Sequence, residues 1–119
     1  MELAVTPAER QHGLSDRDAL AEDAGMLFDM GQVGTPDFWM KDMRFPLDMV
    51  WIDATKRVAG VTAGVQPQPG APDSALKLYR SPAAIRYVLE LNAGAAKKLG
   101  FTTGASVDFT LPAVTPIPG

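Results

Sequence analysis

Residues 38–53 read FWMKDMRFPLDMVWID, and they hold both tryptophans of the chain and two of its five phenylalanines. From Leu47 onward almost every position is apolar, and successive side chains of a strand point to opposite faces of its sheet. This pattern predicts a strand with Leu47, Met49 and Trp51 on one face and Asp48, Val50 and Ile52 on the other. Because both faces are apolar apart from the aspartate, we expect a strand that is covered on both sides.

Asp48 stands at the head of this predicted strand, in a setting that is otherwise apolar and aromatic. A buried carboxylate without a partner costs free energy, so a partner is expected nearby. The sequence offers Lys41 just before the strand and Arg86 in a later strand. We therefore predict that Lys41 or Arg86 pairs with Asp48 across neighbouring strands.

Length and composition limit the class of protein. With 119 residues, 46% of them hydrophobic and 21% charged, the chain fits one globular domain. It has no cysteine, which excludes disulfides, thiolate zinc sites and cysteine nucleophiles. The net charge of -3 and the scattered Lys and Arg residues argue against nucleic acid as a partner. No apolar run approaches the roughly 18 residues that a membrane-spanning helix needs.

The pattern of short strands predicts the fold class. We count six or seven short strands, two short helices and no βαβ pattern, which favours antiparallel pairing. Thr6, Pro7 and Glu9 predict a capped helix start, and Asn92 is a candidate N-cap for a second helix over residues 93–99. Strands are also expected from Leu76 to Tyr79 and from Ala84 to Leu91. The last strand is expected to carry Val107, Phe109 and Leu111.

These elements predict a mostly β protein (β-rich α+β), a compact antiparallel sandwich or distorted barrel that is jelly-roll-like. We expect a single β-rich domain over residues 1–111. Residues 112–119 contain three prolines and are expected to form a disordered C-terminal tail.

Two glycines in the strand expected over residues 57–65 break its regular alternation. Gly60 and Gly64 indicate either a bulge or a place where another group passes close to the backbone.

The sequence shows none of the usual catalytic or metal-binding motifs. Its one histidine, His12, falls in the last turn of the first predicted helix, where a solvated side chain interacting with the helix dipole is the favoured interpretation. We therefore predict no cofactor and no metal. The carboxylates of Asp48, Asp53 and Glu90 could in principle act as an acid–base pair, with Asp48 and Glu90 meeting across strands.

Six residues form the candidate functional set, either as a ligand-binding patch or as internal salt bridges and packing at the rim of the core. Aromatic, basic and carboxylate side chains together are typical of sites that hold sugars, peptides or carboxylate ligands. The six are Trp39, Lys41, Asp48, Tyr79, Arg86 and Glu90.

Four motifs, in the same order along the chain, resemble the "domain of unknown function 192" family of bacteria and archaea. They are Glu22-Asp23-Ala24-Gly25-Met26-Leu27-Phe28, Phe38-Trp39-Met40-Lys41, the segment from Pro46-Leu47-Asp48 to Ile52-Asp53, and Arg86-Tyr87-Val88-Leu89-Glu90-Leu91-Asn92-Ala93-Gly94. The resemblance extends from about Glu2 to Phe109. Two places depart from the family pattern: Ser15-Asp16 stands where Met-Phe is usual, and Asp42-Met43 where Asn-Thr is usual.

The resemblance implies a single β-rich domain with a jelly-roll-like or barrel-like sandwich. Many bacterial relatives carry an export signal, so we expect a periplasmic or extracellular location, although the first residues lack the basic and apolar regions of a signal peptide. The family has no assigned activity, so the resemblance provides no catalytic residue.

Three functions compete at this point. The favoured one is an extracytoplasmic, non-enzymatic binding or accessory domain whose partner is an unknown small molecule, a glycan or a protein. The second is a small carboxylate-dependent hydrolase or lyase that uses Lys41, Asp48 and Glu90. The third is a structural interaction module that adds an edge strand to another protein.

Overall fold

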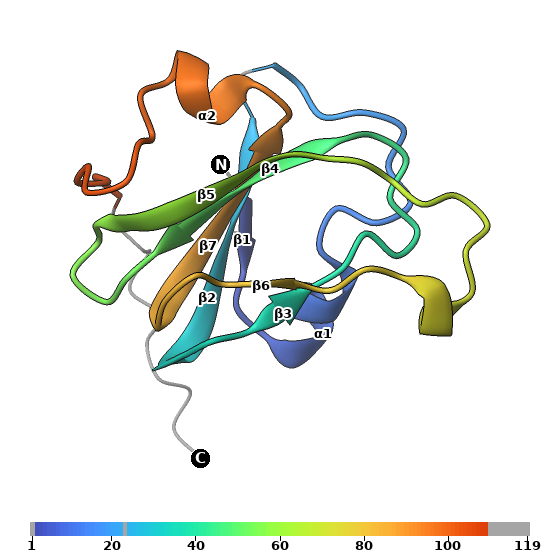
Figure 1. The fold of residues 1–119 in the computed structure, drawn as a ribbon, viewed down its shortest axis with the longest axis horizontal. Coiled ribbons are helices and arrows are strands. Elements are labelled where there is room, and N and C mark those ends of the chain that lie inside the picture. Colours follow the sequence, from blue (N-terminus) through green and yellow to red (C-terminus); the bar gives the residue numbers. More distant parts are fainter. Residues whose placement is uncertain (1, 23, 110–119) are drawn as a thin grey trace.

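A computed structural model of the protein describes residues 2–22 and 24–109. The expected tail over residues 112–119 lies outside the described residues. Figure 1 shows the elements in chain order, which are β1 (Glu2–Ala4), α1 (Pro7–His12), β2 (Gly25–Gly34), β3 (Asp37–Phe38), β4 (Leu47–Ile52), β5 (Val58–Val65), the 3-10 turn η1 (Asp73–Ala75), β6 (Tyr79–Arg80), β7 (Ile85–Asn92) and α2 (Ala95–Lys98).

The strands form two sheets. Five of them make one sheet in the order β1-β2-β7-β4-β5, and β3 pairs with β6 in a separate two-stranded ribbon. All pairs are antiparallel except β1 with β2. The larger sheet is open, with β1 and β5 at its edges, so it does not close into a barrel. The predicted fold class is confirmed as a mostly β, sandwich-like domain with two short α-helices among the described residues.

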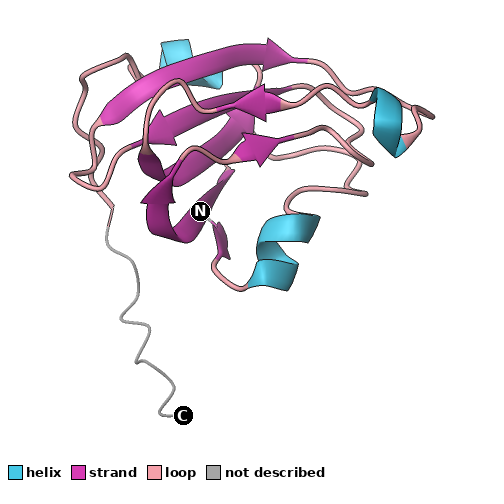
Figure 2. Ribbon diagram, turned by 60° about the horizontal axis from the view of Figure 1, so that its bottom comes forward, coloured by secondary structure: helices cyan, strands magenta, loops and turns pink. Residues whose placement is uncertain are grey.

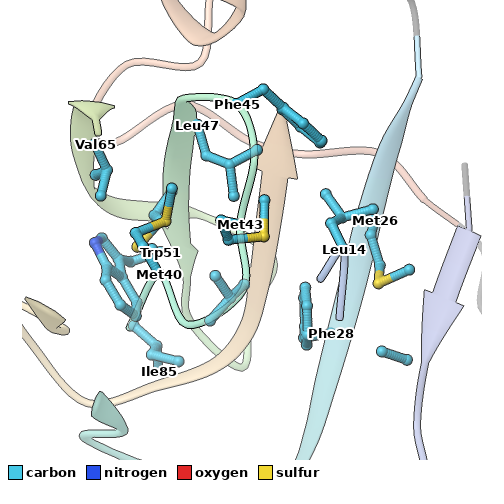
Figure 3. Packing of buried hydrophobic residues seen from close by; sticks show 13 residues of the cluster. Leu14, Met26, Phe28, Met40, Met43, Phe45, Leu47, Trp51, Val65 and Ile85 are labelled. Carbon is cyan, nitrogen blue, oxygen red and sulfur yellow. The ribbon is translucent and has the colours of Figure 1, made fainter. Parts of the chain in front are cut away.

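The predicted central strand is β4, and every one of its residues is buried. Its two faces separate as the alternation predicts. Leu47, Met49 and Trp51 join one apolar cluster, and Val50 and Ile52 join another on the opposite side of the sheet. Figure 3 shows the first cluster, in which side chains from β2, β4 and β7 meet those of the loops above them.

Phe38 connects the β3–β6 ribbon to the larger sheet. Its ring makes edge-to-face contacts with Phe28 of β2 and Trp51 of β4, with ring centroids 5.3 and 5.6 Å apart. Tyr79 of β6, which pairs with Phe38, packs against the same cluster. Because aromatic pairs of this geometry prefer fixed orientations, they hold the ribbon at a defined place above the sheet.

The two α-helices lie on opposite sides of the larger sheet (Figure 2). The predicted start of α1 is confirmed: the Glu9 amide donates to Thr6 Oγ1 at 3.1 Å, and the Thr6 amide donates to Glu9 Oε1 at 3.0 Å. The helix ends at Gly13, whose φ of 52° is one that glycine adopts without strain. The predicted N-cap of α2 is wrong, because Asn92 still belongs to β7 and Gly94 occupies the cap.

Two strand predictions near the C-terminus need correction. The strand expected over residues 76–79 is instead the two-residue β6, which pairs with β3 only through Tyr79 and Arg80. The last predicted strand is absent as far as Phe109; Leu111 lies outside the described residues. Ser106 makes one bridge to Arg57, and the Val107 amide donates to the Lys56 carbonyl, so this segment is irregular. Val107 and Phe109 nevertheless fill the second cluster.

The predicted irregularity of β5 is confirmed, and each of its two glycines has its own reason. The pairing of β4 with β5 shifts register between Leu47 and Met49, beside Gly64, whose φ is 62°. At Gly60 a Cβ atom would lie 2.7 Å from Pro82 Cγ. One glycine therefore permits a bulge, and the other permits close approach of the chain.

Candidate functional site

A pocket of about 240 Å³ lies between α1 with its following turn and the segment of chain that runs from β3 toward β4. Strands β2 and β7 supply its floor. Its aromatic and apolar lining consists of Phe28, Phe38, Trp39, Leu14, Met30 and Met43. Its ionisable lining consists of Arg10, His12, Asp37, Lys41 and Glu90. We call this the Glu90 pocket.

Glu90 comes from the middle of β7, where its register partners are Met26 of β2 and Met49 of β4. Its side chain is 4% exposed. Within residues 2–22 and 24–109 no group donates a hydrogen bond to its carboxyl, and the carboxyl oxygens keep access to the pocket. The acid therefore lies between two strands with its carboxyl oxygens open to the pocket and bonded to no described group.

Burial has a direct effect on the ionisation of this acid. Desolvation raises the pKa of Glu90 from 4.5 to about 8. At neutral pH the carboxyl group is therefore mostly protonated and can donate a hydrogen bond. It can also ionise at little cost once a positive charge comes into contact with it.

The turn after α1 passes close above Glu90. A Cβ atom on Gly13 would lie 3.1 Å from Phe28 Cζ and 3.8 Å from Glu90 Oε1. The end of α1 therefore lies directly against the acid, and a side chain at position 13 would intrude into the Glu90 pocket.

Three other charged groups of the pocket, Arg10, Lys41 and Asp37, already have partners. Arg10 donates to the carbonyl oxygens of Val5 and Asp29. Lys41 Nζ lies 3.0 Å from Asp73 Oδ2 and 5.5 Å from the centre of the Trp39 ring.

Asp37 is matched by Arg80, which donates to its carboxylate at 3.0 and 3.2 Å. This hydrogen bonding lowers the pKa of Asp37. Glu90 differs from these rim groups in having neither a counter-charge nor a donor among the described residues.

The structure brings together three of the six predicted site residues. Trp39, Lys41 and Glu90 all line the Glu90 pocket. Tyr79 instead packs beneath the β3–β6 ribbon, with Lys77 Nζ 5.0 Å from its ring centre.

Arg86 also lies outside the pocket lining. It donates to Asp29 Oδ1 at 3.3 Å, and this hydrogen bond raises the pKa of Arg86.

The predicted partner of Asp48 is wrong. Its carboxylate accepts hydrogen bonds from the backbone amides of Gly64 at 2.9 Å and of Gly94 and Ala96 at 3.0 Å. The cations that were expected to pair with it bind Asp73 and Asp29 instead. The expectation that Asp48 needs a partner was sound, but amide donors satisfy a buried carboxylate as well as a cation does.

The proposed pairing of Asp48 with Glu90 as acid and base is also excluded by the register. Asp48 lies opposite Leu91, and Glu90 lies opposite Met49. Asp48 shares a strand face with Val50, whereas Glu90 shares the face of Val88, and these faces belong to different clusters. The two carboxyl groups therefore point to opposite sides of the sheet.

Sequence reasoning missed the contribution of α1 to this site. Arg10, His12 and Gly13 line the pocket, although the sequence indicated only a solvated helix end for His12. The capping box and Gly13 fix where the helix starts and ends. Which strand lies beneath that end depends on long-range packing, for which the sequence has no local signal.

Two structural surveys bear on function. Among the described residues, no group of three or more His, Asp or Glu side chains is placed to hold a metal ion. No helix in the same part of the chain is long and apolar enough to cross a membrane.

Comparison with known structures finds close relatives of this fold. A protein of Sinorhizobium meliloti 1021, described provisionally as a transcription regulator, is 37% identical with a TM-score of 0.79; the match covers 90% of this chain and 78% of that one. A protein of unknown function from Novosphingobium aromaticivorans DSM 12444 is 30% identical with a TM-score of 0.80, over 91% and 73% of the two chains.

Comparison with curated proteins finds no match. A family model does match: DUF192, described as an uncharacterized ACR, aligns with residues 1–109. That span includes the four motifs and every residue of the Glu90 pocket. The chain therefore belongs to the DUF192 family.

Proposed function

We propose that this protein is a non-enzymatic binding domain that takes a small ligand into the Glu90 pocket. One observation carries the proposal: the carboxyl group of a buried residue, with no partner in residues 2–22 and 24–109, opens into a pocket walled by Phe28, Phe38 and Trp39. Ligand sites are typically concave and apolar with a few converging polar groups, and a perturbed pKa inside a cleft favours a functional role. A ligand would supply the partner that the described part of the chain does not.

An enzyme remains the second candidate, because an acid with a pKa of about 8 is well matched to proton transfer near neutral pH. The pocket is less well supplied with a buried second catalytic group. Asp48 lies on the other side of the sheet, Lys41 is paired with Asp73, and His12 is exposed at the end of α1. This arrangement favours binding over hydrolysis.

At the β5 edge of the larger sheet, an edge-strand module fits the structure less well. The outer strand β5 carries two register shifts, and Ser106 bridges to its neighbouring Arg57. Bulges and coverage of this kind protect an edge against pairing with another chain.

We do not extend to this chain the regulatory role in the description of the Sinorhizobium relative. The net charge of the present chain is -3, and its described α-helices have six and four residues. Such helices are poorly suited to reading a DNA groove. We also propose that the protein lies outside the cytoplasm, because it resembles exported relatives. Fractionation of the native cells tests this location.

A fragment screen followed by amide and indole NMR shifts tests the binding function. We expect fragments to shift the Gly13 amide and the Trp39 indole signal, because both groups line the pocket. Glu90→Gln should weaken the binding of these fragments, whereas Glu22→Gln, the same change at an exposed glutamate, should not. Fragments that collect elsewhere would contradict the proposal, and so would ester, phosphate or glycoside hydrolysis that Glu90→Gln abolishes.

A further inference from the structure

We propose that the ligand of the Glu90 pocket is an organic cation, a small amine in its ammonium form, held by Glu90 as its counter-ion. This inference rests on the proposed binding function and adds the chemical class of the ligand.

The buried ionisable group without a described partner in the pocket is an acid, whereas His12 is exposed. Arg10 is held by two carbonyl oxygens, Lys41 by Asp73 and Asp37 by Arg80. Glu90 is 4% exposed, opens into the cavity and has no partner among the described residues. A ligand carboxylate would have to compete with Asp73 for Lys41, whereas a ligand ammonium would meet a free acid. Charge complementarity therefore favours a cation.

The walls of the pocket suit an ammonium group. Phe28, Phe38 and Trp39 contribute three aromatic rings, and the faces of such rings attract cations. Trp39 already has the ammonium of Lys41 5.5 Å from its ring centre. Aromatic rings beside one carboxylate recur in sites that bind amines, because the rings replace part of the water that the cation loses.

The cavity limits the size of the ligand. Its volume of about 240 Å³ lies below the range of roughly 300–1,000 Å³ that is typical of drug-sized ligands. A short alkyl amine fits this space, with its chain against Leu14, Met30 and Met43.

Binding must release a proton if this assignment is correct. The free acid is protonated at neutral pH, so R–NH₃⁺ and Glu90–COOH combine as an ammonium–carboxylate pair, and one H⁺ leaves to solvent. The apparent affinity should therefore rise with pH and level off above about pH 8.

The contribution of other ionisable groups near the acid to this pH dependence must be separated from that of Glu90. Arg10 and His12 face the pocket from α1, and Asp37 and Lys41 face it from β3 and the segment after it. The pair of Asp29 with Arg86 lies on the two floor strands. A His12→Gln variant removes the imidazole and so separates any contribution of His12 from that of Glu90.

A matched series of ligands with one carbon skeleton tests the inference. We would titrate n-butylammonium, butyramide and butanoate by calorimetry at pH 6.5 and 9.5, in buffers of different ionisation enthalpy. Shifts of the Gly13 amide and the Trp39 indole locate the binding. We expect n-butylammonium to bind in the pocket, to release close to one proton at pH 6.5, and to bind roughly 30-fold more tightly at pH 9.5, where Glu90 is already ionised.

Variants test whether Glu90 is the group that binds the ammonium and releases the proton. Glu90→Gln should lower the affinity for n-butylammonium at least about tenfold and remove the proton release, because the amide cannot ionise. Glu22→Gln should match the wild type, and His12→Gln should retain the proton release. Binding of n-butylammonium that persists in Glu90→Gln would overturn the inference.

The failure of this inference can be told apart from failure of the binding function itself. If butyramide or butanoate shifts the Gly13 and Trp39 signals and n-butylammonium does not, the pocket binds ligands but not cations. If none of the three shifts these signals while fragments also avoid the pocket, the binding function falls as well.

Discussion

Asp48 and Glu90 are both buried carboxylic acids at the centre of the same sheet, with side chains 1% and 4% exposed. They lie on the neighbouring strands β4 and β7, one residue out of register with each other. Asp48 accepts three hydrogen bonds from backbone amides. Glu90 accepts none from the described residues and opens into a pocket.

The difference shows that burial alone does not identify a functional acid. Asp48 joins the bulge at Gly64 to the start of α2 at Gly94 and Ala96, so its charge stabilises the fold. Glu90 contributes no such contact, and its burial raises its pKa to about 8. An acid whose partners come from the backbone is structural, and an acid that awaits a partner is a candidate site.

The largest expected effect is the pH dependence that Glu90 imposes on stability. Its pKa is about 8 in the folded protein against an ordinary 4.5, so the folded state keeps a proton that the unfolded state loses between these values. The free energy of unfolding should therefore fall as pH rises from 4.5 to 8, by on the order of 4 kcal/mol, and change little above that.

Urea unfolding of wild type and Glu90→Gln across this pH range is the measurement. The difference between the two curves isolates Glu90, because carboxyl groups with a lowered pKa, such as Asp37 and Asp53, act below pH 4.5. Glu22→Gln should follow the wild type. Parallel curves for wild type and Glu90→Gln would contradict the claim that Glu90 causes this pH dependence of stability.

The next effect concerns Asp48. Replacement by alanine leaves three amide donors without their acceptor and should lower the free energy of unfolding by about 3 kcal/mol at pH 7. Asp18→Ala, which removes an exposed carboxylate paired with Arg44, should cost under about 0.5 kcal/mol. Urea midpoints of the two variants measure the difference. A loss below about 1 kcal/mol for Asp48→Ala would show that these hydrogen bonds contribute little.

The smallest effect is expected at the rim of the Glu90 pocket. Lys41 and Asp73 pair at 3.0 Å, but their side chains are 43% and 60% exposed. A double-mutant cycle of Lys41→Met and Asp73→Asn should therefore give a coupling energy below about 0.5 kcal/mol. A coupling of about 2 kcal/mol would place this pair among the structural contacts beside Asp48.

Much of the fold could be predicted from local patterns in the sequence. The alternation of Leu47 to Ile52 correctly assigns each side chain to one face of β4, and the capping box correctly places α1. The Ala84–Leu91 prediction overlaps β7. The segment after Arg57 is less regular than its alternation suggests, because bulges shift its register against β4. In the sequence, only Gly60 and Gly64 indicate this irregularity.

The candidate site was harder to predict. Alternation places Arg86 and Glu90 on one face of β7, but it does not show that Arg86 binds Asp29 while Glu90 has no hydrogen-bond partner among the described residues. Likewise, no local pattern shows that amides satisfy Asp48, or that Gly13 lies against Glu90. These contacts join residues far apart in the chain, so they follow from the packing of the sheet and not from local spacing.

The most direct test is the ionisation of Glu90 itself. The carboxyl carbon signals of the protein, labelled with ¹³C in its glutamate side chains, can be followed by NMR from pH 4 to 10, with Glu90→Gln assigning the signal. A midpoint of about 8 for Glu90 in the ligand-free protein is the result that this account predicts. A midpoint near the ordinary 4.5 would mean that the acid is hydrated or paired, and would contradict the claim that it awaits a ligand.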